Sequence, residues 1–147
     1  MDQQNDLELI DDLTSELYKS ICFEVGGHPP VDRLIKLFIP TARMIRNDEA
    51  SPEVMTVDGF IKSYTERISD GTVKSFYEGE IHNITEIFGT IAHRFSTYKK
   101  ILDLTKSESF SIGINSIQYI KIGENWKISG IVWNNQNDTN KIPDKYL

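Results

Sequence analysis

The sequence predicts an α+β fold in which three N-terminal helices pack in the concavity of a strongly curved, mainly antiparallel sheet. Apolar residues recur every three to four positions through most of the first 70 residues, and after residue 71 the apolar period changes to two. Helices at one end of a chain and successive strands at the other are typical of the α+β class. Strands of this length twist, so we expect the sheet to curl around the helices as a half-open cone.

Two helices are expected before residue 41. The first has an apolar stripe at helical spacing, Asp6 as a suitable N-cap, and the glycine pair at 26–27 as its end. A second, short helix is expected to open at the proline pair at 29–30, because proline suits the first helical turn. Pro40 is expected to stop it.

A short strand and a third helix are expected next. Residues 42–46 are predicted to form the strand, and residues 47–52 a polar loop. Thr56 is a suitable N-cap for the third helix, in which Phe60 begins the apolar stripe. Asp70 and the glycine after it are expected to close this helix.

The remainder of the chain is predicted to form an antiparallel meander of four strands. These strands are residues 72–84, 86–98, 110–122 and 126–133. Gly79 is expected to cause a bulge, and residues 83–86 and 123–125 are expected to form turns. A single bulge reverses which side chains of a strand point inward. The sequence therefore does not decide which face of these strands lines the inside of the cone.

Length and composition limit the class of protein. We expect one domain over residues 1–147, with its core at about 7–134 and a polar tail at 134–147, of which residues 134–140 are expected to be mobile. Cys22 is the single cysteine, so no internal disulfide can form and a cytoplasmic location is expected. The net charge of −6 disfavours nucleic acid as a partner. No apolar run approaches the ~18 residues of a membrane span.

Short motifs in the strand region carry a resemblance to a known family. They are Ile91-Ala92-His93 with Phe95-Ser96-Thr97-Tyr98, Gly113 with Asn115-Ser116-Ile117-Gln118, Trp126 with Trp133, and the ending Ile142-Pro143-Asp144-Lys145-Tyr146-Leu147. With them the chain resembles the nuclear transport factor 2-like superfamily over about residues 7–134. This superfamily has a cone-shaped, cystatin-like fold and includes SnoaL-like proteins and ketosteroid isomerase.

The resemblance looks closest to a bacterial branch of that superfamily. It implies a homodimer that pairs through the outer face of the sheet. Enzymes, carriers and scaffolds share this fold, so the resemblance does not set the chemistry.

The leading functional hypothesis is a small-molecule-binding protein with a partly apolar pocket inside the cone and no cofactor. The predicted pocket residues are Tyr18, Phe60, Tyr64, Arg94, Ser96, Tyr98, Asn115, Ile117 and Trp133. Arg94 inside the pocket would favour a carboxylate or another anion. Equally open is a place for Arg94 on the convex face, paired with Glu78 or Glu80.

A second hypothesis is a cofactor-independent dehydratase or isomerase that works by proton transfer. Its candidate base is His93, with Tyr18 and Asn115 as partners, and it requires the imidazole to point into the cavity. Since neighbours on a strand alternate sides, His93 and Arg94 cannot both line the cavity without a bulge. The carboxylate base of ketosteroid isomerase has no counterpart in residues 42–46.

A third hypothesis is a non-catalytic, dimeric interaction module with a shallow cone and a large apolar outer patch. Whether the protein is an enzyme stays open between the three. His82 and His93 lie on neighbouring predicted strands, but they lack the tight spacing of metal ligands, so no metal is expected.

Overall fold

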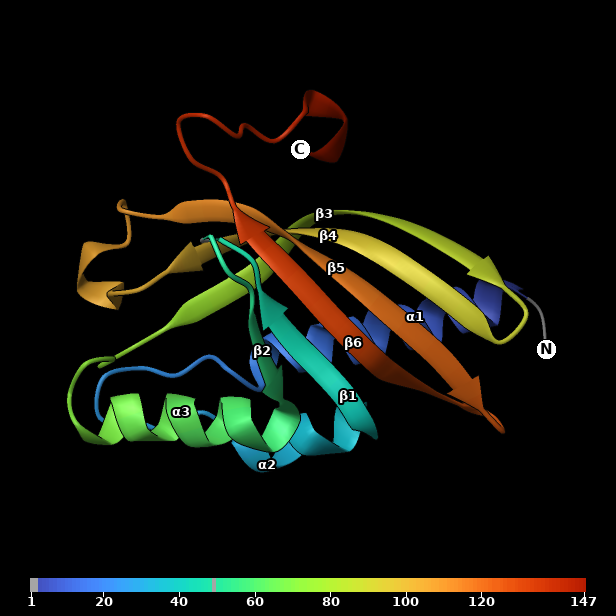
Figure 1. Ribbon diagram of the computed structural model, residues 1–147, viewed down its shortest axis with the longest axis horizontal. Helices are drawn as coiled ribbons and strands as arrows, with labels where there is room; N and C mark the ends of the chain where they lie inside the picture. The colour runs from blue at the N-terminus through green and yellow to red at the C-terminus, as the bar shows by residue number, and fades with distance from the viewer. Residues whose placement is uncertain (1–2, 49) are drawn as a thin grey trace.

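A single six-stranded mixed sheet organises the computed structural model, which describes residues 3–48 and 50–147 (Figure 1). The strand order is β2-β1-β6-β5-β4-β3. The strands are β1 (Phe38–Arg46), β2 (Glu53–Thr56), β3 (Tyr77–Phe88), β4 (Ile91–Ile101), β5 (Ser111–Ile122) and β6 (Asn125–Asn135). The α-helices are α1 (Gln3–Lys19), α2 (Val31–Leu34) and α3 (Val57–Ser69). Short 3₁₀ helices are η1 (Ile35–Leu37), η2 (Leu104–Lys106) and η3 (Asp144–Tyr146).

The pairing of the strands confirms the predicted fold class. Four of the five strand pairs are antiparallel, and the parallel one joins β1 to β6, with Met44 opposite Ile131. Residues 1 and 2 of the predicted domain and residue 49 of the predicted loop lie outside the described residues.

The apolar stripe of α1 packs against the concave face of the sheet. Ile10 and Leu17 belong to the main core cluster together with Ile117, Tyr119 and Ile128. A second cluster gathers around Tyr64 of α3 and the segments that flank this helix, and its other buried members are Phe23 and Val73. The buried residues therefore form two clusters, one that includes α1 and one around Tyr64 of α3.

The first helix differs from its prediction at both ends. It begins at Gln3 and stops at Lys19, ahead of the glycine pair, and Gly26 has a φ of 84° in a later turn. Asp6 lies within the helix, where its carboxylate accepts hydrogen bonds from Lys121 Nζ at 2.9 Å and Trp126 Nε1 at 3.0 Å. The residue that suited an N-cap instead ties α1 to strands β5 and β6.

The second helix is shorter than predicted and the first strand is longer. The helical turns end with η1, and β1 begins at Phe38 and runs through Pro40. The register with β6 shifts between Phe38 and Arg43, so Pro40 falls in an irregular stretch where its missing N–H costs no ladder hydrogen bond. Strand β2, which pairs with β1, was not predicted.

The hairpin between β3 and β4 was predicted at the wrong place. The turn lies at Gly89 and Thr90, with a φ of 58° at Gly89, and residues 83–86 lie inside β3. The register irregularity of β3 falls between Glu80 and His82 rather than at Gly79. A left-handed glycine between two extended runs was the correct turn signal.

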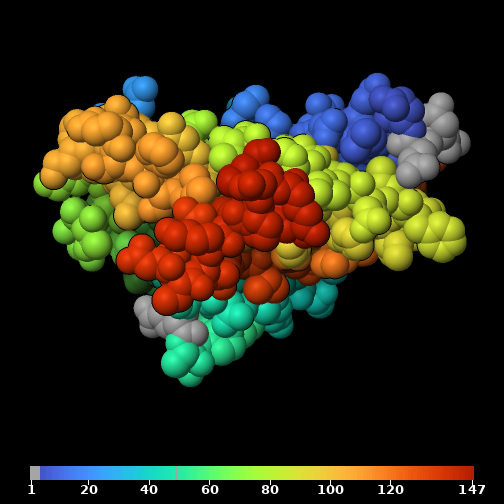
Figure 2. All heavy atoms as spheres, turned by 90° about the horizontal axis from the view of Figure 1, so that it is seen from above, coloured from blue at the N-terminus to red at the C-terminus, as the bar shows by residue number. Residues whose placement is uncertain are grey.

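The C-terminal residues pack on the convex side of the sheet. Thr97 Oγ1 donates a hydrogen bond to the backbone oxygen of Tyr146 at 2.6 Å, and the rings of Phe95 and Tyr146 lie 5.3 Å apart. Figure 2 shows the residues after β6 lying over this face of the molecule. The end of the chain is thus held to the sheet by a hydrogen bond and a ring contact. Of the stretch 134–140 that was predicted to be mobile, Asn134 and Asn135 belong to β6.

Candidate functional site

A cavity of about 600 Å³ lies between the concave face of the sheet and helix α3. Its apolar wall includes Met44, Ile131, Trp133, Phe60 and Tyr64. The Phe60 ring stands edge-on to Trp133 with centroids 6.5 Å apart, and it lies 5.8 Å from the Tyr64 ring. Rigid aromatic rings of this kind offer a large apolar surface to a bound molecule.

The other end of the cavity is polar. Glu78 of β3 lies directly opposite Lys100 of β4 in the strand register, so the two side chains share the inner face. Asn115 Nδ2 donates a hydrogen bond to Glu78 Oε2 at 3.2 Å. Lys100 Nζ donates to Asn135 Oδ1 at 3.0 Å, and the Tyr98 hydroxyl donates to the same oxygen.

Burial changes the acidity of both charged groups. It raises the pKa of Glu78 to about 7, although the Asn115 hydrogen bond and the Lys100 charge act in the opposite direction. Burial also lowers the pKa of Lys100, against the attraction of Glu78 and Asp48. A carboxyl group that titrates near neutral pH in a cavity is a candidate functional group.

Three of the remaining charges near the cavity, Arg46, Glu53 and Asp48, have partners in the protein. Arg46 pairs with Glu53 at 3.5 Å. Asp48 accepts hydrogen bonds from the backbone N of Asn135 at 2.7 Å and from its Nδ2 at 2.8 Å. Arg67 lies at an exposed position of α3.

The structure places some predicted pocket residues in the cavity wall and others behind it. Phe60, Tyr64, Tyr98, Asn115 and Trp133 line the cavity. The four others do not: Tyr18, Arg94, Ser96 and Ile117.

Tyr18 and Ser96 support the polar end from behind. Asn115 Nδ2 donates to Tyr18 Oη at 3.0 Å, and Tyr18 Oη lies 2.6 Å from Ser96 Oγ. Burial raises the pKa of Tyr18, so its phenol stays neutral at pH 7. The chain of hydroxyl and amide groups fixes the Asn115 amide beside Glu78.

Arg94 lies on the inner face of β4 but does not reach the cavity. Its guanidinium is almost fully buried against α1, where it pairs with Asp11, contacts Glu80 at 3.3 Å and donates to Thr85 Oγ1 at 2.7 Å. Neither of the two places considered for Arg94, inside the pocket or on the convex face, is the one that the structure shows. The predicted pairing with Glu80 is present. Ile117 is fully buried in the core beside α1.

His93 lies on the outer face of the sheet. Its side chain is half exposed, and its Nε2 lies 2.8 Å from Glu86 Oε1. The dehydratase or isomerase hypothesis therefore lacks the base it assigned. Among residues 3–48 and 50–147, no group of three or more His, Cys, Asp or Glu side chains is placed to hold a metal ion.

Glu78, Lys100 and Asn135 are polar cavity residues that the sequence did not predict. The signal for the first two is the turn at Gly89. Counting outward from that turn, and allowing for the bulge after Glu80, brings Glu78 opposite Lys100. The misplaced turn hid this pair.

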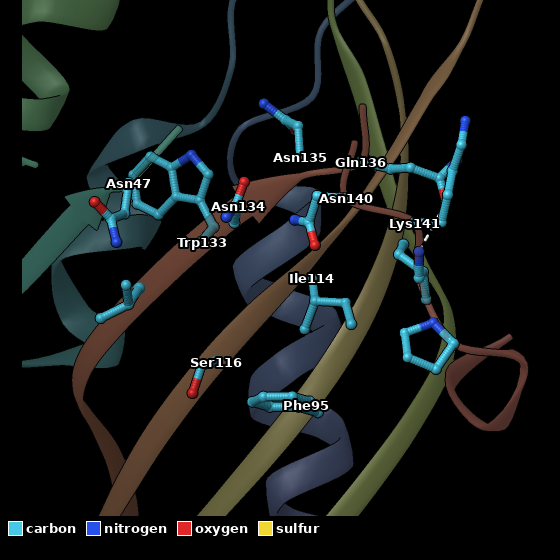
Figure 3. Close-up of a pocket in the computed structure, with 13 residues that line it drawn as sticks. Asn47, Phe95, Ile114, Ser116, Trp133, Asn134, Asn135, Gln136, Asn140 and Lys141 are labelled. Carbon is cyan, nitrogen blue, oxygen red and sulfur yellow. Dashed lines mark hydrogen bonds between the residues drawn. The ribbon is translucent and has the colours of Figure 1, made fainter. Parts of the chain in front are cut away.

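A second, smaller hollow of about 260 Å³ lies on the convex side (Figure 3). Phe95 and Ile114 of the sheet form part of its floor, and Asn140 and Lys141 of the C-terminal segment form part of its rim. In Figure 3, α1 lies behind the sheet, so this hollow and the cone cavity occupy opposite faces.

None of the described helices is both long and apolar enough to cross a membrane.

No protein-family model matches the chain, and no curated protein matches its sequence. Several solved structures match the fold of the chain. An NTF2-like protein of unknown function from Pseudomonas putida KT2440 matches with a TM-score of 0.72 and 10% identity, over 97% of this chain and 96% of the other. LinA matches with a TM-score of 0.73 and 10% identity, over 92% of this chain and 88% of the other.

An uncharacterized protein with a cystatin-like fold from Caulobacter vibrioides matches with a TM-score of 0.71 and 11% identity, over 92% of each chain. Identities this low speak for the fold and not for a shared activity. The curved sheet, the helices in its concavity and these matches agree, and the chain therefore has the nuclear transport factor 2-like, or cystatin-like, fold.

Proposed function

We propose that this protein binds a small, partly apolar organic molecule in the cone cavity. The observation that carries the proposal is the cavity itself, with about 600 Å³ of space between an aromatic wall and one polar end. Ligand sites usually have this size and this combination of apolar walls with a few convergent polar groups. A cone filled by side chains would have removed the proposal.

A cavity-filling variant on α3 tests it. Ser63 lines the cavity, whereas its neighbour Lys62 does not, and both are exposed positions of the same helix. We expect Ser63→Trp to weaken binding of the neutral probe 2-naphthamide at least tenfold, and Lys62→Trp to leave it unchanged, as measured by calorimetric titration. Equal affinities in the two variants would place the probe elsewhere and contradict the proposal.

Proton transfer is a second candidate function, and Glu78 favours it where His93 does not. The carboxylate of Glu78 would take a proton from a carbon next to a carbonyl, the C–H electron pair would move onto the carbonyl oxygen as an enolate, and return of the proton would complete the exchange. In deuterated water the protein would then exchange deuterium into 2-tetralone, and Glu78→Gln would lose this activity. Exchange at the uncatalysed rate would contradict this candidate.

We also propose a homodimer through the outer face of the sheet. Ile84, Phe95 and Val132 lie on this face and are each about 40% exposed. Strand alternation puts them on the side opposite the cavity.

A cytoplasmic location stays a prediction from the single cysteine.

Light scattering at several protein concentrations tests the dimer. Ile84→Lys is expected to shift the molar mass from dimer to monomer, because a charge would be buried in the interface. Val54→Lys is the matched control, since Val54 is an exposed apolar residue of the edge strand β2. A monomeric parent protein would refute the dimer without affecting the cavity.

A further inference from the structure

We propose that the cavity selects small apolar molecules that carry a carboxylate, that Lys100 binds this carboxylate, and that Glu78 takes up a proton when it binds. The inference rests on the proposed function and names the chemical class of ligand for the same cavity. It depends on three features of the polar end. Lys100 has no ion pair within residues 3–48 and 50–147, it lies opposite the carboxyl group of Glu78, and most of the other charged side chains of the cavity have partners in the protein.

Lys100 is a half-buried cation whose contacts are with neutral groups. Its Nζ donates to the amide oxygen of Asn135 at 3.0 Å and lies 5.8 Å from the centroid of the Tyr98 ring. Within the described part of the chain, no carboxylate lies within 4.0 Å of it. Withdrawing an ammonium group from water is costly unless a counter-ion replaces the water. A ligand carboxylate would supply that counter-ion.

The other charged groups of the cavity are less available. Arg46 and Glu53 form an ion pair, and two donors of Asn135 hold Asp48. Arg67 stands on α3 at an exposed position. Lys100 is therefore a cation of the polar end that has no ion pair among the described residues, and Glu78 is the carboxyl group opposite it. Asp48 also attracts Lys100 through its charge, but the Asn135 donors hold its carboxylate.

Glu78 faces several titratable groups from the surrounding elements. They are Tyr18 from α1, Cys22 from the segment after it, Tyr64 from α3, and Tyr98 and Lys100 from β4. Burial raises the pKa of the three tyrosines and of Cys22, so these groups stay neutral near pH 7. Glu78 is thus the group of this end that changes charge near neutral pH.

A carboxylate bound at Lys100 would lie beside Glu78, because the two residues are opposite each other in the strand register. Two neighbouring carboxylates do not both ionise readily, so the bound anion raises the pKa of Glu78 further and a proton is taken up. By linkage, affinity for the anion rises as pH falls through the range where Glu78 titrates, by up to about tenfold per pH unit. A neutral ligand of the same shape lacks this dependence.

A matched pair of probes tests the proposal on the intact protein. 2-Naphthoate and 2-naphthamide share one ring system and differ in charge, and an ordinary carboxylic acid stays ionised at both pH 6 and pH 8. We expect calorimetry to show about tenfold tighter binding of 2-naphthoate at pH 6 than at pH 8, and no such change for 2-naphthamide. Titrations in two buffers of different ionisation enthalpy should show proton uptake with 2-naphthoate.

Two variants assign the effects to residues. Lys100→Met should remove the preference for 2-naphthoate and leave 2-naphthamide binding intact. Glu78→Gln should remove the pH dependence, while its amide oxygen still accepts the hydrogen bond from Asn115. Lys99→Met is the control, because Lys99 is the next residue and its ammonium lies over the Phe110 ring instead.

The outcomes separate this proposal from the one on which it rests. Equal affinity of the unmodified protein for both probes would overturn carboxylate selection and leave the binding cavity standing. Binding of 2-naphthoate with no pH dependence and no proton uptake would overturn the role of Glu78. If neither probe binds in the cavity, the proposed function fails and this inference fails with it.

Discussion

Gly113 decides how the ring of Tyr98 lies against the sheet. A Cβ atom at this position would stand 2.2 Å from Tyr98 Oη, 2.5 Å from Tyr98 Cζ and 2.7 Å from the backbone oxygen of Asn134. The absence of a side chain lets the phenol cross β5 and reach Asn135, which also holds Lys100. One glycine thus shapes the polar end of the cavity.

Gly113→Ala should lower the free energy of unfolding by about 2 kcal/mol, because the new methyl group meets both a buried ring and backbone. Gly130→Ala is the control: its Cβ would lie 3.5 Å from the backbone oxygen of Arg43, an ordinary contact. Urea denaturation of both variants checks this. Similar stability of the two would show that the Tyr98 ring moves aside freely.

Glu78 should make stability depend on pH in a direction opposite to an ordinary ion-paired carboxylate. Its pKa rises from an ordinary value of 4.5 to about 7 in the folded protein, so the folded state holds the proton more tightly than the unfolded chain. The resulting stabilisation is complete below about pH 4.5 and is lost as pH rises through 7.

Glu78→Gln removes this titration. Relative to the unmodified protein, the variant is expected to gain thermal stability between pH 5 and pH 8, since glutamine never carries the buried charge. Melting temperatures of the two proteins at matched pH values give the difference directly. A constant difference across that range would mean that Glu78 has the same pKa in both states.

At the scale of elements, helix α3 forms one wall of the cavity and depends on its first turn. Thr56 Oγ1 accepts a hydrogen bond from the backbone N of Gly59 at 2.9 Å, as the sequence predicted for an N-cap. Thr56 is also the last residue of the short strand β2, so α3 follows this strand directly.

Thr56→Ala should lower the free energy of unfolding by about 1 kcal/mol, the usual cost of a lost cap. Thr65→Ala, within the same helix, removes only hydroxyl bonds to the carbonyls of Ile61 and Lys62 and is expected to be neutral or slightly stabilising. Guanidinium denaturation distinguishes them. An unaltered Thr56→Ala would show that packing alone fixes the start of α3.

Elements with a strong local signal were predictable, and those fixed by distant contacts were not. Thr56 predicted the start of α3 because a cap acts within three residues. Asp6 carried the same local signal, but a lysine and a tryptophan more than a hundred residues away recruit its carboxylate. Strand β2 has only four residues and exists because β1 pairs with it.

At the scale of the whole molecule, the two faces of the sheet carry different features. The concave face holds the cavity, and the convex face holds the C-terminal segment. Tyr146→Ala should therefore cost about 1 kcal/mol of stability through its lost ring contact with Phe95, and leave probe binding in the cavity unchanged.

Lys141→Ala is the control for this segment, because its ion pair with Asp138 is exposed and spans 3.8 Å. It should change neither stability nor binding. A change in probe affinity with Tyr146→Ala would show that the two faces communicate through the sheet.

The whole-molecule fold was predictable from the order of helical and strand periods. Most of the apolar wall of the site was predictable too, and so were Tyr98 and Asn115 of its polar end, but not the charged groups there. Phe60 and Tyr64 follow from their spacing on α3, and Trp133 follows from its size and its place on the last strand. Glu78 and Lys100 meet through a register that depends on one turn and one bulge. A sequence pattern cannot fix such a register when the turn is misplaced by a few residues.

The parallel pairing of β1 with β6 has a consequence for synthesis on the ribosome. Met44 meets Ile131, so the strand that leads into the α3 wall waits for the final strand before it can join the sheet. While the nascent chain emerges, α1 and the β3–β4 hairpin can form, but the space between the sheet and α3 stays open to water. The binding chamber is therefore among the last parts of the protein to come into existence, and a chain arrested before β6 would have none.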